Sequence, residues 1–122
     1  TCRRNTVRRR VLSLHKTVRK HFGEVVTVTQ EVQDIISSPI VKEAIINNSD
    51  CKILLDQRKF MNRFDAIQTL LGLTDKEKAQ ILSINMSNHP GRKYKEVWIG
   101  LGGVQSAVYA TEVSKQEYLV RP

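Results

Sequence analysis

The sequence has few cysteines, few aromatic residues and no long apolar segment, and each shortage excludes a class of protein. Its 122 residues include two cysteines, Cys2 and Cys51, which are too few for a disulfide scaffold. Their spacing relative to the three histidines matches no zinc-binding pattern. No apolar run approaches the roughly 20 residues that span a bilayer, and no segment resembles a signal peptide. The composition therefore favours one compact domain in the reducing cytoplasm.

The sequence also lacks the motifs of a site that hydrolyses nucleotides. A phosphate loop follows the pattern G-x-x-x-x-G-K-S/T, whose backbone amides bind phosphate oxygens, and this pattern does not occur. Segment 99–103 (IGLGG) is interpreted as a hairpin turn. Segment 54–57 (LLDQ) comes closest to an acidic magnesium strand but has only one acid. Cys51 is interpreted as a small residue at the start of a buried strand. Surface positions are expected for His15, His21 and His89.

Positive charge is concentrated at the N-terminal end of the chain. The formal net charge is +8, from 20 basic and 12 acidic residues. The first twenty residues contain no acid, and residues 21–122 carry equal numbers of both signs. Only this end is therefore expected to attract the phosphates of nucleic acid, without sequence preference. We divide the chain into a basic arm, residues 1–15, and an α/β domain, residues 16–122. The cations of the first twenty residues are Arg3, Arg4, Arg8, Arg9, Arg10, Lys16, Arg19 and Lys20.

Apolar and β-branched patterns predict alternating helices and strands along the chain. Gly23 is expected to end the first helix, and two capping boxes, Thr74 with Glu77 and Ser114 with Glu117, predict later helix starts. Two strands joined through a helix favour a βαβ unit with parallel strands. The predicted elements are a helix over 6–22, a strand over 24–29, a helix over 39–47, a strand over 51–57, helices over 59–72 and 74–82, a hairpin over 94–113 and a short helix from 114.

Three segments, 16–57, 58–85 and 94–114, resemble the C-terminal end of TraG-family ATPases from conjugative transposons. These ATPases are relatives of the VirB-class motors of type IV secretion, and the resemblance covers residues 16–119. It implies an α/β fold, the C-terminal part of a RecA-like P-loop NTPase domain, with a βαβ unit, further helices and a terminal β-hairpin. It also implies that the complete protein is a hexamer that powers DNA transfer or pilus assembly.

The resemblance has consequences for ligands and partners. ATP and magnesium are expected in the complete family protein, between adjacent subunits, and no cofactor is expected in these residues alone. The phosphate loop and the magnesium strand of the family should lie upstream of residue 1, so this segment alone is expected to be inactive. Its partners would be other subunits and other components of conjugation or type IV secretion. Its location would be the cytoplasm, at the cytoplasmic face of the inner membrane.

Two residues are candidates for a role in hydrolysis, Gln30 and Arg19. Gln30 follows a predicted strand, and ligands of open α/β sheets bind at the carboxyl ends of strands. The alternative is a polar strand end that bonds its own loop. The resemblance implies that Gln30 senses the terminal phosphate and that Arg19 is an arginine finger for the neighbouring subunit's nucleotide. Without the resemblance, Arg19 is one more solvated cation of a basic helix.

A protein of another class remains as the alternative, a small basic nucleic-acid-binding protein that uses residues 1–20. The clustered cations favour it. Residues 1–20 contain no aromatic side chain and no motif that reads bases, which counts against it.

Overall fold

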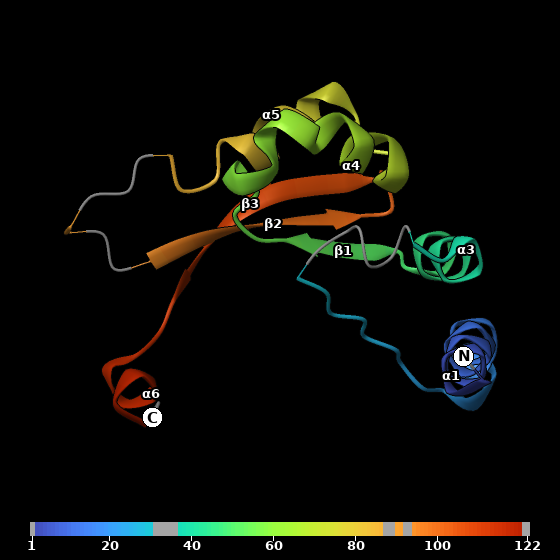
Figure 1. Cartoon of the computed structure of the whole chain (residues 1–122). Helices are drawn as coiled ribbons and strands as arrows, with labels where there is room; N and C mark the ends of the chain where they lie inside the picture. The colour runs from blue at the N-terminus through green and yellow to red at the C-terminus, as the bar shows by residue number, and fades with distance from the viewer. Residues whose placement is uncertain (1, 31–36, 87–89, 92–93, 121–122) are drawn as a thin grey trace. The chain divides into compact units, whose positions relative to one another are not determined.

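The computed structural model describes residues 2–30, 37–86, 90–91 and 94–120. The chain forms two compact units, residues 1–50 and residues 51–122, which we call unit 1 and unit 2. Unit 1 contains helices, and unit 2 contains a sheet with helices on one of its faces (Figure 1). Each unit has buried apolar side chains of its own.

Unit 1 is built on two neighbouring helices, α1 (Cys2–Thr17) and α3 (Pro39–Asn48), which pack beside each other (Figure 1). Ala44 and Ile45 of α3 are buried. Pro39 occupies the first turn of α3, as predicted, because its missing N–H has no partner to lose there. Ser38 precedes it, but its side chain makes no capping hydrogen bond. The predicted helix over 39–47 is confirmed within one residue at its C-terminal end.

The first helix ends differently from the prediction. A 3-10 turn, η1 (Val18–His21), follows α1, and Phe22 then adopts the left-handed conformation with φ of 54°. The Phe22 N–H donates to the Arg19 carbonyl at 3.2 Å, and the Gly23 N–H donates to the Val18 carbonyl at 3.1 Å. This is the Schellman pattern, in which glycine usually takes the left-handed position. Phe22 takes it here, and Gly23 follows at a position where an added Cβ would lie 2.8 Å from Val18 Cγ2.

The predicted strand over 24–29 is wrong, because these residues form no strand. Val26 and Val28 are 83% and 89% exposed. A β-branched sequence favours extended backbone, but a strand is stable only when a neighbour pairs with it and covers one of its faces. Within the described residues of unit 1, no second strand is present to pair with this segment.

Unit 2 contains a three-stranded antiparallel sheet in the order β1 (Cys51–Leu54), β2 (Tyr94–Leu101), β3 (Gln105–Glu112). Ile53 of β1 faces Ile99 of β2, and Trp98 of β2 faces Val108 of β3. The expected βαβ unit is therefore wrong in its pairing, since β1 pairs antiparallel with the hairpin and not parallel with residues 24–29. Strand β2 of the hairpin offers a backbone partner to every residue of β1, and residues 24–29 offer none.

Helices cover one face of this sheet (Figure 1). The 3-10 helix η2 (Arg58–Arg63) leads into α4 (Phe64–Leu71), and α5 (Asp75–Leu82) follows after a short turn. Gly72 ends α4 in the left-handed conformation, as predicted. The last helix is α6 (Lys115–Val120). The buried apolar core of this unit comprises Phe64, Ile67, Leu73, Ile81, Ile84 and Trp98.

The predicted hairpin and both capping boxes are confirmed. Gly102 and Gly103 form the turn with φ of 53° and 76°. Thr74 Oγ1 accepts from the Glu77 N–H at 3.3 Å at the start of α5. At α6 the box is reciprocal, because Glu117 Oε2 accepts from the Ser114 N–H at 2.9 Å and Ser114 Oγ accepts from the Glu117 N–H at 3.2 Å. These bonds from Ser114 lower the pKa of Glu117.

Candidate functional site

Arg19 lies in η1 at the surface of unit 1. Its Nη2 donates to Asp50 Oδ2 at 2.6 Å, and the two side chains are 82% and 72% exposed. An ion pair this exposed holds its partners weakly, by about 0.2–1 kcal/mol. Arg19 can therefore exchange Asp50 for a stronger anion. Asp50 was not predicted from the sequence, although one signal was present, an acid placed directly before a predicted strand.

Gln30 lies at the exposed end of segment 23–30, the segment in which the predicted strand does not form. Within the described part of unit 1, no hydrogen bond or ion pair joins Gln30 to Arg19. The structure thus leaves both side chains at the surface and does not bring them together through a direct contact. Their assigned roles stay predictions.

His15 anchors segment 23–30 to α1. His15 Nδ1 lies 2.8 Å from the Val11 carbonyl oxygen, and His15 Nε2 lies 3.2 Å from Thr27 Oγ1. A carbonyl can only accept, so Nδ1 carries the proton and Nε2 accepts from the Thr27 hydroxyl when the ring is neutral. The expected solvated position is therefore wrong for His15, which is half-buried, and right for His21, which is exposed. His89 lies outside the described residues.

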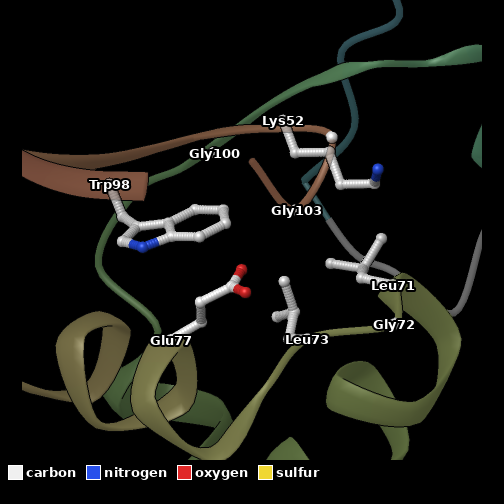
Figure 2. Close-up of a pocket in the computed structure, with 9 residues that line it drawn as sticks. Lys52, Leu71, Gly72, Leu73, Glu77, Trp98, Gly100 and Gly103 are labelled. Carbon is white, nitrogen blue, oxygen red and sulfur yellow. The ribbon is translucent and has the colours of Figure 1, made fainter. Parts of the chain in front are cut away.

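A small pocket lies below the turn of the hairpin in unit 2 (Figure 2). Trp98, Glu77 and Leu73 line it together with Lys52 and glycines of the hairpin. Its volume is about 30 Å³, which is room for about one water molecule. Sites for small molecules measure roughly 300–1,000 Å³, so this pocket does not hold a nucleotide. The interpretation of segment 99–103 as a hairpin agrees with this geometry.

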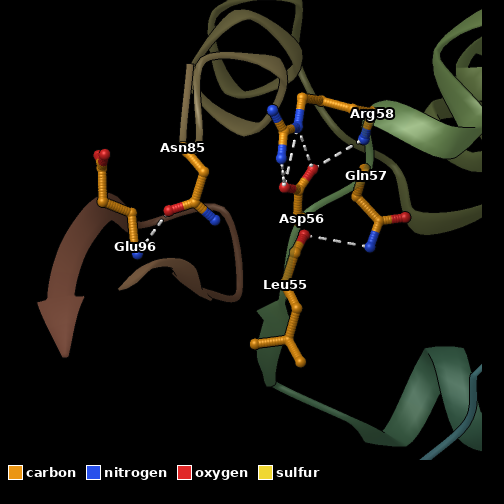
Figure 3. A network of polar contacts seen from close by, with 6 residues as sticks. All are labelled: Leu55, Asp56, Gln57, Arg58, Asn85 and Glu96. Carbon is orange, nitrogen blue, oxygen red and sulfur yellow. Dashed lines mark hydrogen bonds and ion pairs between the residues drawn. The ribbon is translucent and has the colours of Figure 1, made fainter. Parts of the chain in front are cut away.

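Asp56 follows β1 and forms the centre of a polar network (Figure 3). Arg58 Nε donates to its two carboxylate oxygens at 3.0 and 2.9 Å, and the Arg58 N–H donates to Oδ1 at 3.0 Å. The Arg58 side chain is the main reason that the pKa of Asp56 lies below its usual 3.8. Asn85, which is buried, accepts from the Glu96 N–H at 3.0 Å. A side-chain hydrogen bond with Asn85 is a further, smaller cause of the lowered Asp56 pKa, so Asn85 links the end of β1 to the start of β2.

Cys51 is exposed at the start of β1, so the expected buried position is wrong. It lies on the face of the sheet opposite Trp98, because side chains alternate along a strand and Cys51 pairs with Leu101. In the residues that the structure describes, no group of three or more His, Cys, Asp or Glu side chains is placed to hold a metal ion. None of the described helices is both long and apolar enough to cross a membrane.

Comparison with known families identifies the class of the protein. The model of the TraG P-loop domain matches residues 3–121, which is nearly the whole chain. The chain therefore belongs to the TraG P-loop domain family, a family of P-loop proteins related to conjugation. The resemblance seen in the sequence is confirmed, and the α/β fold class of the P-loop NTPase type is confirmed with it. No curated protein and no solved structure matches the chain. The division at residue 15 stays a prediction.

Proposed function

We propose that this chain is the part of a conjugation ATPase that completes a nucleotide site from outside the phosphate loop. The observation that carries the proposal is membership of the TraG P-loop domain family over residues 3–121. The exposed side chain of Arg19 and its weak contact with Asp50 support it, because an arginine that acts across a subunit interface must be able to reach outward. The motor would act at the cytoplasmic face of the inner membrane, with other components of conjugation or type IV secretion.

The described residues do not themselves fit ATP and magnesium. The pocket below the hairpin has room for about one water molecule, with a volume of about 30 Å³. No phosphate-loop pattern occurs among the 122 residues. We therefore assign the binding of ATP and magnesium to residues other than the described ones, and we assign Arg19 and Gln30 a role in hydrolysis alone.

Arg19 and Gln30 have complementary tasks in this proposal. The planar guanidinium of Arg19 matches phosphate oxygens and adds positive charge where negative charge develops during phosphoryl transfer. The amide of Gln30 can donate to a phosphate oxygen or accept from the attacking water. Neither task requires tight binding of the nucleotide by these two side chains.

The experiment measures binding and hydrolysis separately. In the isolated chain, a fluorescent ATP analogue with magnesium should show no micromolar binding, and its addition should give no turnover. In a fusion of this chain to the phosphate-loop half of a TraG-family ATPase, Gln30→Ala should lower hydrolysis while binding stays within about twofold of the parent fusion. The matched control is Gln105→Ala, an exposed glutamine of β3 in unit 2, which should change neither. Micromolar binding by the isolated chain, or normal hydrolysis by the Gln30→Ala fusion, would refute the proposal.

A further inference from the structure

One face of the unit 2 sheet is apolar and carries no helix within the described part of this unit. Trp98 of β2 is buried on the face that α4 and α5 cover (Figures 1 and 2). Because side chains alternate along a strand, Ile99 of β2 and its pairing partner Ile53 of β1 point to the other face. Ile53 is 60% exposed there. We call this surface the open face, and its apolar side chains are Ile53, Val97, Ile99, Leu101, Ala107 and Tyr109.

Helix α6 carries a second uncovered apolar surface of the same unit. Tyr118, Leu119 and Val120 at its C-terminal end are between 74% and 81% exposed. The reciprocal capping box of Ser114 and Glu117 fixes the start of the helix. A helix of six residues is only marginally stable without packing. A surface that covers these three side chains would therefore also stabilise α6.

The helix α6 is too short to cover the open face of its own molecule. Two residues link Glu112 at the end of β3 to α6, and they span at most about 7 Å. The helix itself adds about 9 Å. Leu101 pairs with Gln105, which lies seven residues before Glu112, or about 23 Å along β3. The part of the open face around Leu101 is therefore out of reach of the molecule's own α6.

A second copy of the chain has the surfaces that would cover both. At roughly 60–100 Å² for each exposed apolar side chain, the open face and the end of α6 together present roughly 600 Å². Monomers rarely expose a larger apolar patch than this. A standard interface buries about 800 Å² on each partner, and its polar rim supplies part of that area. The apolar area of one unit 2 is therefore close to what one partner of a stable dimer needs.

We propose that two copies of this chain form a two-fold dimer in which α6 of each copy packs on the open face of the other. The contact is isologous, because each copy gives one helix and receives one. Each sheet then has helices on both of its faces, which is the usual layering of an α/β fold. The contact uses neither Arg19 nor Gln30, so it stands independently of the proposed role in ATP hydrolysis.

Analytical ultracentrifugation of the full chain over a series of concentrations tests the dimer. The chain should sediment with twice its mass of 14.0 kDa and dissociate on dilution. Leu119→Lys on α6 and Ile53→Lys on the open face should each raise the dissociation constant of the dimer by about tenfold or more. Both side chains are exposed in the single chain, so the fold should persist, and far-UV circular dichroism checks this. The matched control is Val104→Lys, which adds the same charge at a 92% exposed valine outside both surfaces and should leave the dissociation constant unchanged.

Mixing the two variants tests the exchange of helices itself. A dimer of Leu119→Lys chains has two altered helices, and a dimer of Ile53→Lys chains has two altered open faces, so neither keeps an intact contact. A mixed dimer keeps one, between α6 of the Ile53→Lys chain and the open face of the Leu119→Lys chain. With one variant fluorescently labelled, fluorescence-detected sedimentation should therefore show more association in the mixture than in either variant alone.

Three results would overturn the proposal. The first is a chain that stays monomeric up to about 100 μM, which would leave the two surfaces without a partner of this kind. The second is an equal loss of association in Val104→Lys, which would mean that added charge alone separates the copies. The third is association that the two variants weaken but that their mixture does not recover, which would mean that the copies pack sheet on sheet without exchanging α6.

Discussion

Gly100→Ala tests the packing that holds unit 2 together. Gly100 and Trp98 lie on the same face of β2, since side chains alternate along a strand. A Cβ on Gly100 would overlap with Cη2 of Trp98 and would lie 2.8 and 2.9 Å from two further ring atoms. Carbon atoms pack at roughly 3.5–4.0 Å, so the ring must move. Trp98 is only 1% exposed and its Nε1 donates to Gln80 Oε1 at 3.3 Å, so movement of the ring disturbs the core and this bond.

Overpacking of this kind costs about 1–3 kcal/mol. Urea unfolding followed by the fluorescence of Trp98, the single tryptophan of the chain, measures the loss directly. Gly103→Asn is the matched control, because Gly103 has φ of 76° with open space around it, and asparagine tolerates that conformation. The control should cost less than about 0.5 kcal/mol. A similarly small loss for Gly100→Ala would show that the Trp98 ring does not lie over Gly100, and the described packing of the Trp98 side chain would then be wrong.

Three smaller predictions concern charges and caps. Arg58 lowers the pKa of Asp56 in the folded protein, so the Asp56 carboxylate stabilises the fold fully above its usual pKa of 3.8, and this stabilisation is lost as the pH falls through the lowered pKa. Asp56→Asn should therefore make the stability to urea depend less on pH below about 4. An unchanged dependence on pH in this variant would contradict the prediction. Thr74→Ala removes the hydroxyl that caps α5 and should cost about 1 kcal/mol by urea unfolding, and a cost near zero would show that the cap is not formed in solution. Asp50→Asn should change stability by less than about 1 kcal/mol, because its pair with Arg19 is exposed, and a larger loss would show that Arg19 is not available to an outside ligand.

Local signals in the sequence predicted much of unit 2. Both capping boxes, the glycine end of α4 and the hairpin turn depend on residues within a few positions of one another. Their geometry is decided by short-range hydrogen bonds and by φ preferences, which a single sequence shows directly. These elements are confirmed for that reason.

Pairing over long sequence distances was not predictable in the same way. The β-branched run over 24–29 has the composition of a strand, but composition does not say whether a partner is present. β1 pairs with Leu101 and its neighbours, about fifty positions along the chain from Cys51. Antiparallel pairing with the hairpin and parallel pairing with residues 24–29 agree equally well with the apolar pattern of β1. The sequence pattern could therefore predict the strand but not its neighbour.

The candidate site likewise contains residues that the sequence predicted and contacts that it did not. The resemblance to the family pointed to Arg19 and Gln30, and the structure places both at the surface, where a ligand can reach them. Asp50 was missed because it contacts Arg19 across 31 positions of sequence. The left-handed conformation of Phe22 was not predicted, because Gly23 beside it is the better helix terminator by propensity alone, whereas the structure places Phe22 in that position and Gly23 one residue later.

The role of Arg19 across a subunit interface is the central claim, and mixed assemblies test it most directly. In fusions of this chain to the phosphate-loop half of a TraG-family ATPase, Arg19→Ala should lower hydrolysis by about a thousandfold or more, while Arg63→Ala, an exposed arginine of unit 2, should not. Mixing Arg19→Ala subunits with subunits that lack a working phosphate loop should restore part of the turnover, because the intact arginine of one subunit then completes the intact pocket of another. Normal hydrolysis by Arg19→Ala alone, or no recovery in mixtures whose co-assembly is confirmed, would contradict the account.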